Sequence, residues 1–180
     1  MKQLLSFILF LFSSVGYAQI EMSSPATIIM ESDSGKQIRA TNDNVGVYYN
    51  TTTNELRIRL DLSKMVTGDS TLDANFQALT PKRMIFIASI NNPDQFFGTH
   101  NVDALQMEGS WWYGNNSTTT EAEYMPETFV EEDQSRQKTR LQFNNQLDIR
   151  SLQIPVLSAL SSYAFSISLP DAYINLVTQF

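Results

Sequence analysis

The strongest constraint on the fold is an alternation of apolar and charged residues over residues 55–62. Every second residue there is apolar, namely Leu56, Ile58, Leu60 and Leu62. The residues between them are charged. Because successive side chains of a β-strand point to opposite faces, this period of two predicts a strand with one buried and one solvated face. Residues 45–49 are β-branched or aromatic apart from Gly46, and they predict a hairpin partner joined through a turn at 50–54.

Strand signals recur along the rest of the chain. They lie at residues 82–90, 102–112, 141–149, 164–169 and 173–178. The centre of residues 82–90 is apolar on both faces, and Asn145 interrupts the apolar face of residues 141–149. About eight strands with one-sided apolarity are typical of an antiparallel all-β barrel or sandwich. A closed barrel of eight strands has room inside for side chains or for one slender ligand.

One stretch has helical spacing instead. Three apolar residues fall at i, i+4 and i+7, namely Leu72, Phe76 and Leu79. Asp69 or Ser70 is suited to cap the start, and Pro81 prevents continuation. These signals predict one short amphipathic helix over residues 70–79 that covers an open mouth or an edge of the sheet. Residues 155–161 predict a second helical turn.

The N-terminus is typical of a secretory signal. A basic start precedes an apolar run over residues 4–12, and small residues follow at Gly16 and Ala18. We expect residues 1–18 to be removed by cleavage after Ala18, because the apolar run is shorter than the roughly 20 residues that a membrane-spanning helix needs. Residues 19–180 are then expected to form a single β-barrel domain in the periplasm or outside the cell, not an integral membrane protein.

The charge and composition of the chain exclude some classes of binding partner. The formal net charge is −7, so the chain repels phosphate backbones and anionic membrane surfaces. We therefore expect neither a nucleic-acid partner nor membrane attachment through a basic patch. The chain has no cysteine, so an exported domain must be held together by its core without disulfides.

No constellation of residues predicts catalysis. His100 is the only histidine, and no cysteine is present to complete a transition-metal site with it. The acidic stretch 121–133 lacks the Asp-x-Asp-x-Asp-Gly spacing of a calcium loop, and we predict a solvated loop there and at the polar segment 115–120. Neither a Gly-x-Ser-x-Gly motif nor a glycine-rich phosphate loop occurs. We expect a protein that is not an enzyme and that holds no metal or cofactor.

The segments between residues 56 and 90 follow one another in a recognisable order. A strand leads to a Thr-Gly turn at 67–68, then to a short helix that contains Phe76, and then to a strand opened by Pro81. Together with the later strand that contains Gly109, this order resembles the YceI-like family of periplasmic lipid-binding barrels. The resemblance implies a lipocalin-like, eight-stranded antiparallel barrel whose apolar tunnel holds an isoprenoid or fatty chain. It implies no catalytic residues.

If such a tunnel exists, its lining comes from inward-facing apolar positions. The candidates are Ile58, Leu60, Phe76, Phe86, Met107, Trp111, Phe143 and Ile167. For each of them, ordinary core packing is the alternative role. The resulting hypothesis is a periplasmic or secreted carrier of an amphiphilic, isoprenoid-like or fatty ligand.

Three other functions remain open. By alternation Trp111 faces inward and Trp112 outward, so an exposed pair of Trp112 and Tyr113 would suit a non-enzymatic β module that binds another cell-envelope protein. A C-terminal phenylalanine, Phe180, is compatible with an outer-membrane barrel, but the outward face of residues 55–62 is charged instead of apolar. An enzyme with two carboxylates far apart in sequence is the remaining class.

Overall fold

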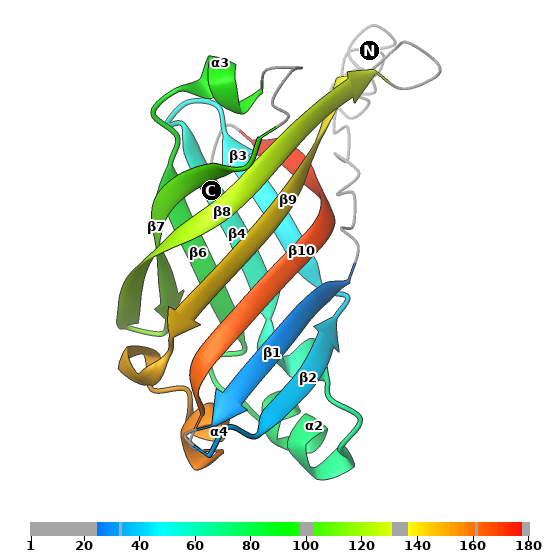
Figure 1. Ribbon diagram of the computed structural model, residues 1–180, viewed down its shortest axis with the longest axis vertical. Helices are drawn as coiled ribbons and strands as arrows, with labels where there is room; N and C mark the ends of the chain where they lie inside the picture. Colours follow the sequence, from blue (N-terminus) through cyan, green and yellow to red (C-terminus); the bar gives the residue numbers. More distant parts are fainter. Residues whose placement is uncertain (1–24, 33, 98–102, 131–136, 161, 178–180) are drawn as a thin grey trace, which may run out of the picture.

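Ten strands form one continuous sheet in the computed structural model, which describes residues 25–32, 34–97, 103–130, 137–160 and 162–177. Their order along the sheet is β3 (Val45–Asn50), β4 (Glu55–Asp61), β6 (Arg83–Ser89), β7 (Leu105–Tyr113), β8 (Asn116–Val130), β9 (Gln137–Asp148), β10 (Ser162–Val177), β1 (Ala26–Ser32), β2 (Gln37–Asn42) and β5 (Met65–Val66). The end of β10 also pairs in parallel with β3, where Ile174 lies opposite Val47. This pairing closes seven strands into a barrel (Figure 1).

The predicted antiparallel barrel is confirmed, with seven strands in the closed ring and three strands beyond it. β1, β2 and β5 continue the sheet from the first half of β10. Asn42, which is fully buried, attaches this extension to the ring. Its Nδ2 donates to the carbonyl oxygen of Asp61 at 2.7 Å, and its Oδ1 accepts from the Asn44 amide at 2.8 Å. The extension therefore joins the barrel wall beside the end of β4.

The alternation of apolar and charged residues that predicted β4 also determines which of its side chains are buried. Its apolar residues are buried, whereas the charged residues between them are only partly covered. β3 and β4 form the predicted hairpin, with Val45 opposite Leu60 and Asn50 opposite Glu55. The same one-sided burial is found along β6, β7 and β9. One apolar face per strand, turned inward, therefore builds the core.

Short helices lie at the two ends of the barrel. Figure 1 shows α2 (Ser70–Gln77) and α4 (Pro155–Ala159) at one end and α3 (Pro93–Phe96) at the other. The predicted helix is confirmed as α2, and Asp69 caps it by accepting from the amides of Thr71 and Leu72 at 2.9 and 3.1 Å. The second predicted helical turn is α4. The described residues also form two short 3₁₀ helices, η1 (Leu62–Lys64) and η2 (Arg150–Leu152).

Two sequence predictions of loops were wrong. Only Gly114 and Asn115 form the turn between β7 and β8, and residues 116–120 already belong to β8. The acidic residues 121–130 continue the same strand instead of forming a solvated loop. β8 is a strand because its first part, residues 116–124, pairs with β7 and its second part, residues 122–130, pairs with β9, so its polar side chains lie on a sheet. The predicted final strand at 173–178 is likewise part of the longer β10.

Several predictions lie outside the described residues. They concern the signal segment 1–18, His100, and residues 131–133 of the acidic stretch. Within the described ranges no helix has both the length and the apolar character to cross a membrane.

Candidate ligand-binding interior of the barrel

All eight residues predicted to line an apolar interior lie there and are buried. Each has 7% or less of its surface exposed. They come from α2 and from five strands, namely Phe76 on α2, Ile58 and Leu60 on β4, Phe86 on β6, Met107 and Trp111 on β7, Phe143 on β9, and Ile167 on β10. Because they project from walls all round the ring, the barrel encloses a continuous apolar interior. Whether a ligand contacts them stays a prediction.

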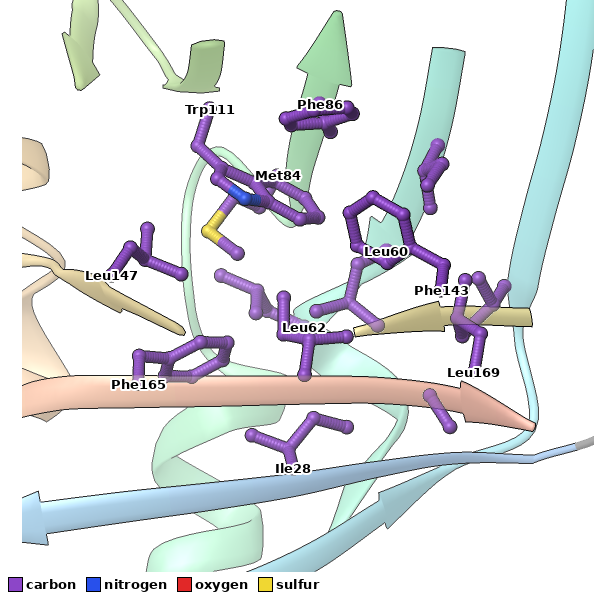
Figure 2. Close-up of a cluster of buried hydrophobic side chains, with 14 of the residues drawn as sticks. Ile28, Leu60, Leu62, Met84, Phe86, Trp111, Phe143, Leu147, Phe165 and Leu169 are labelled. Atoms are coloured by element: carbon purple, nitrogen blue, oxygen red, sulfur yellow. The ribbon is translucent and has the colours of Figure 1, made fainter. Parts of the chain in front are cut away.

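Three aromatic rings meet in the middle of this interior. The Phe86 ring lies 5.3 Å from the Trp111 ring and 5.2 Å from the Phe143 ring, centre to centre. Figure 2 shows the three side chains directed into the space between the strands, together with Leu60 and Met84. Tilted and edge-to-face arrangements at these spacings are favourable for aromatic pairs. Phe76 is set apart from this group, since it projects from α2 at one end of the barrel.

Gly109 makes room for the Phe86 ring. A Cβ atom at Gly109 would lie 2.9 Å from the carbonyl oxygen of Ile87 and closer still to the Phe86 ring. Only glycine therefore lets the ring approach β7 this closely. This contact explains why an inward position of an otherwise alternating strand carries no side chain.

Asn145 is the polar residue that interrupts the apolar face of β9, and it is 6% exposed. Its Oδ1 accepts a hydrogen bond from Trp111 Nε1 at 2.8 Å. Its Nδ2 donates to the Glu121 carbonyl oxygen at 2.7 Å and to Thr120 Oγ1 at 3.1 Å. The amide is thus fully paired inside the barrel, and it fixes the indole of Trp111.

Methionines contribute flexible parts of the lining. Four of them are buried, namely Met30, Met65, Met84 and Met107. An unbranched thioether side chain changes rotamer readily and fills irregular space, so it can yield to an inserted chain more easily than a branched residue. Two of these side chains, Met84 and Met107, project from neighbouring strands of the ring.

Tyr113 was predicted to be exposed and is in fact buried, with 5% of its surface accessible. It follows Trp111 by two positions in β7, and its neighbour across the sheet is the buried Met84. Continuing the alternation by one step would have predicted the inward position. Burial raises the pKa of the Tyr113 phenol.

A second aromatic group that sequence reasoning missed closes the opposite end. Tyr49, Phe96, Phe97 and Tyr124 make ring contacts with centres 4.8 to 5.8 Å apart. Tyr49 also donates from its hydroxyl to Asn54 Oδ1 at 2.8 Å. Phe96 belongs to α3, whose Pro93 start and Asn92 cap are the only local signals of this element in the sequence. Burial raises the pKa of Tyr49 and Tyr124.

A groove of about 430 Å³ lies between α2 and α4. Its walls include Leu72 and Leu79 from the α2 segment and Val156 and Leu160 from the α4 segment. Asn75 lies at its polar rim. The first three of these apolar side chains are 6 to 7% exposed and belong to the hydrophobic core as well as to the groove wall.

Comparison with known proteins supports the fold. A solved polyisoprenoid-binding domain from Saccharophagus degradans, implicated in plant cell wall breakdown, superimposes with a TM-score of 0.59 at 8% sequence identity. The match covers 80% of this chain and 90% of that one. The YceI protein of Campylobacter jejuni aligns with a TM-score of 0.48 at 12% identity, over 72% of this chain and 80% of that one. No family model matches the sequence, and no curated protein matches it either.

The first of these likenesses shows the fold. At 8% identity it carries no information on individual residues. The YceI-like barrel that the sequence resembles is therefore confirmed as the fold of this chain.

Proposed function

We propose that this chain, which has the fold of the YceI-like barrels, binds the apolar chain of an amphiphilic molecule inside its barrel. The ligand is an isoprenoid-like or fatty molecule, and the protein is its carrier. The observation that carries the proposal is the interior itself. Apolar side chains from all round the ring face one another there, and no charged side chain of the described residues is buried.

Binding of an apolar chain does not require a charged residue in the site. Each buried methylene contributes about 0.8 kcal/mol. A chain of about 15 carbons would gain roughly 10 kcal/mol before the costs of association are subtracted. Movable methionine side chains offer one way for a slender chain to enter a lined interior.

The likeness to the polyisoprenoid-binding domain from Saccharophagus degradans supports the same ligand class. That protein is described as binding polyisoprenoids, and it shares the barrel with this chain at the level of fold. Export belongs to the proposal as well. Residues 1–18 direct the chain out of the cytoplasm, cleavage after Ala18 leaves one domain over residues 19–180, and the carrier acts in the periplasm or outside the cell.

Native mass spectrometry of the full chain, expressed in a bacterial host and purified without detergent, tests the proposal. We expect a population heavier than the polypeptide by the mass of a lipid, and solvent extraction should identify that lipid. Mass measurement of the same sample reads out cleavage after Ala18. A sample that never holds an apolar molecule, even after incubation with a fatty alcohol, would contradict the carrier function.

A pair of variants locates the ligand. Met107→Trp adds bulk to the interior, whereas Gln106→Trp adds the same bulk to the outward face of β7. The interior variant should lose the lipid, and the outward variant should retain it. If Met107→Trp is unfolded by circular dichroism, Ala122→Leu at the facing position provides the same test.

A second candidate function is a β module that binds another envelope protein. The observation that favours it is Trp112, which is 42% exposed on the outer face of β7. On β4, two strands away from Trp112, the Arg59 guanidinium lies 5.3 Å from the centre of the Tyr48 ring. Trp, Tyr and Arg are the residues most often dominant in protein interfaces. Under this function Trp112→Ser should abolish capture of the partner while leaving the lipid content unchanged.

A further inference from the structure

The hydroxyl of Tyr113 is a buried polar group that no atom of the described residues pairs with. The other buried polar side chains behave differently. Asn42, Asn50 and Asn145 each form hydrogen bonds to backbone or side-chain atoms. Tyr49, the matching inward tyrosine at the other end of the barrel, donates to Asn54. Tyr113 therefore stands out among the buried polar residues of the interior.

An unpaired hydroxyl in an apolar interior is unfavourable, because burial removes its hydrogen bonds to water without replacing them. A phenylalanine would supply the same ring without this cost. The chain uses phenylalanine at inward positions such as Phe86, Phe143 and Phe165. The hydroxyl at position 113 thus has no structural role among the contacts of the described residues.

The position of Tyr113 places this hydroxyl group at the α2–α4 end of the barrel. Its neighbour across the sheet on β8 is Asn116, whose Nδ2 donates to the Leu152 carbonyl oxygen of η2. The next residue, Gly114, lies against Pro81, just after α2. The groove between α2 and α4 is at this same end, and Thr80 contributes to its lining. A molecule that reached the interior through this end would meet Tyr113 early.

The residues around the Tyr113 hydroxyl indicate which kind of ligand group it can bind. No charged side chain is buried among the described residues, so a phosphate or carboxylate would find no counter-ion in this interior. A neutral oxygen acceptor, in contrast, needs only one donor. A carbonyl oxygen of a ketone, quinone or ester fits a single phenolic O–H.

Resting on the proposed function, we infer that the Tyr113 hydroxyl donates a hydrogen bond to a neutral carbonyl oxygen at the polar end of the bound amphiphile. The apolar chain of the ligand then runs from Tyr113 toward Trp111 and Phe86. Tyr113 is a specificity residue in this arrangement, because it distinguishes a carbonyl-bearing isoprenoid from the corresponding hydrocarbon.

Two probes of similar length test the inference, farnesylacetone as the ketone and farnesene as the hydrocarbon. The wild-type full chain should bind the ketone roughly fivefold more tightly, which is the value of one ordinary hydrogen bond. Tyr113→Phe should remove this preference and leave farnesene binding unchanged. Tyr49→Phe is the matched control, since it deletes a paired hydroxyl at the other end, and it should keep the preference for the ketone.

Infrared spectroscopy of the bound ketone provides a second test beside the binding affinities. Infrared spectra should show the ketone C=O stretch shifted to lower frequency in the wild-type complex and returned in the Tyr113→Phe complex. Equal binding of both probes by the wild type would overturn the role of Tyr113 while leaving the carrier function intact. A ketone preference that survives Tyr113→Phe would also overturn it. Binding of neither probe would instead contradict the proposed function itself.

Discussion

The indole nitrogen of Trp111 donates a hydrogen bond of 2.8 Å to the Oδ1 atom of Asn145, inside an otherwise apolar barrel. The bond links β7 to β9 across the intervening β8. The Nδ2 atom of Asn145 also donates to the backbone of β8 at Glu121. One amide thus holds three strands together, and it fixes the largest ring of the interior in a single orientation.

Asn145→Ala should lower the free energy of unfolding by about 1–3 kcal/mol, because Trp111 Nε1 loses its buried acceptor. Urea unfolding monitored by circular dichroism measures the change. Asn144→Ala is the control, since Asn144 is exposed on the outer face and accepts a hydrogen bond from the Ser168 hydroxyl. The control should change stability by less than about 0.5 kcal/mol. Equal effects for the two variants would show that the buried bond does not matter.

Gly109→Ala should destabilise the barrel by about 1–3 kcal/mol, because the added methyl overlaps the Phe86 ring and the Ile87 backbone. Thermal unfolding reports the change. Gly46→Ala is the matched control on the outer face, where the three atoms nearest to the added methyl all belong to the end of the Tyr48 side chain, from 2.6 Å, and this side chain can move. A Gly109→Ala protein as stable as Gly46→Ala would contradict the close packing of β6 on β7.

Asp69→Ala should cost about 1 kcal/mol of stability, since the first turn of α2 loses the side chain that accepts from two amides. The loss should be local to the α2 end. Hydrogen exchange should therefore accelerate at α2 amides and remain slow in β4 and β9. Ser70→Ala, at an exposed neighbouring position, should leave exchange unchanged, and faster exchange throughout the barrel would argue against a local cap.

The stability of the folded protein should depend on pH through Asp148, and the lowered pKa of this residue fixes the sign of the dependence. The Arg150 guanidinium and then the Arg150 amide donate to this carboxylate, and they lower the pKa of Asp148. A lowered folded-state pKa adds stability above the unfolded-state pKa, and this stability is lost as the pH falls through the folded-state pKa. Since both side chains are substantially exposed, the contribution is at most about 1 kcal/mol.

Asp148→Asn should therefore be slightly less stable than the wild type at neutral pH. The difference should vanish in acid, below the folded-state pKa. Urea midpoints measured over this pH range provide the test. A difference that grows as the pH falls would reverse the assigned sign.

Alternation predicted the core well wherever one face was apolar and the other polar. The inward positions of β4, of β7 and of β9 followed directly from it, including Asn145 as the polar exception. The short helix α2 followed from its apolar spacing and its cap. Most of the candidate interior could thus be located without a structure, because period-two and helical patterns depend only on local geometry.

Other elements lack this local signal. Residues 116–120 are a run of small polar residues and resemble a loop, yet pairing with β7 makes them a strand. β1 was not predicted, because the apolar Ile29 lies on the opposite face from the buried Ile28 and Met30 and obscures their period of two. Likewise, no local pattern predicts that the end of β10 pairs in parallel with β3, since that contact joins distant parts of the chain.

That the closed ring contains seven strands could not be predicted from local sequence patterns either. Closure depends on where β10 bends, and its pairing with β9 shifts register between Leu169 and Ala172, around Pro170. Proline lacks an amide donor and is tolerated in a strand at such irregularities. The sequence contains this proline, but the direction that the chain takes beyond it depends on long-range packing.

The two tryptophans of the chain allow the most direct test of ligand binding, because Trp111 is fully buried inside the barrel and Trp112 is 42% exposed outside it. Trp112→Phe leaves the interior indole as the only tryptophan fluorophore. A fatty alcohol brominated at mid-chain quenches tryptophan only on contact. The measurement is the fluorescence of Trp112→Phe during titration with this alcohol, with acrylamide in water as the control for exposure.

We predict saturable quenching of Trp111 by the brominated alcohol and little quenching by acrylamide. This result would place the apolar chain in contact with the interior indole. A brominated alcohol that binds, as shown by co-purification, but leaves Trp111 fluorescence unchanged would contradict binding inside the barrel.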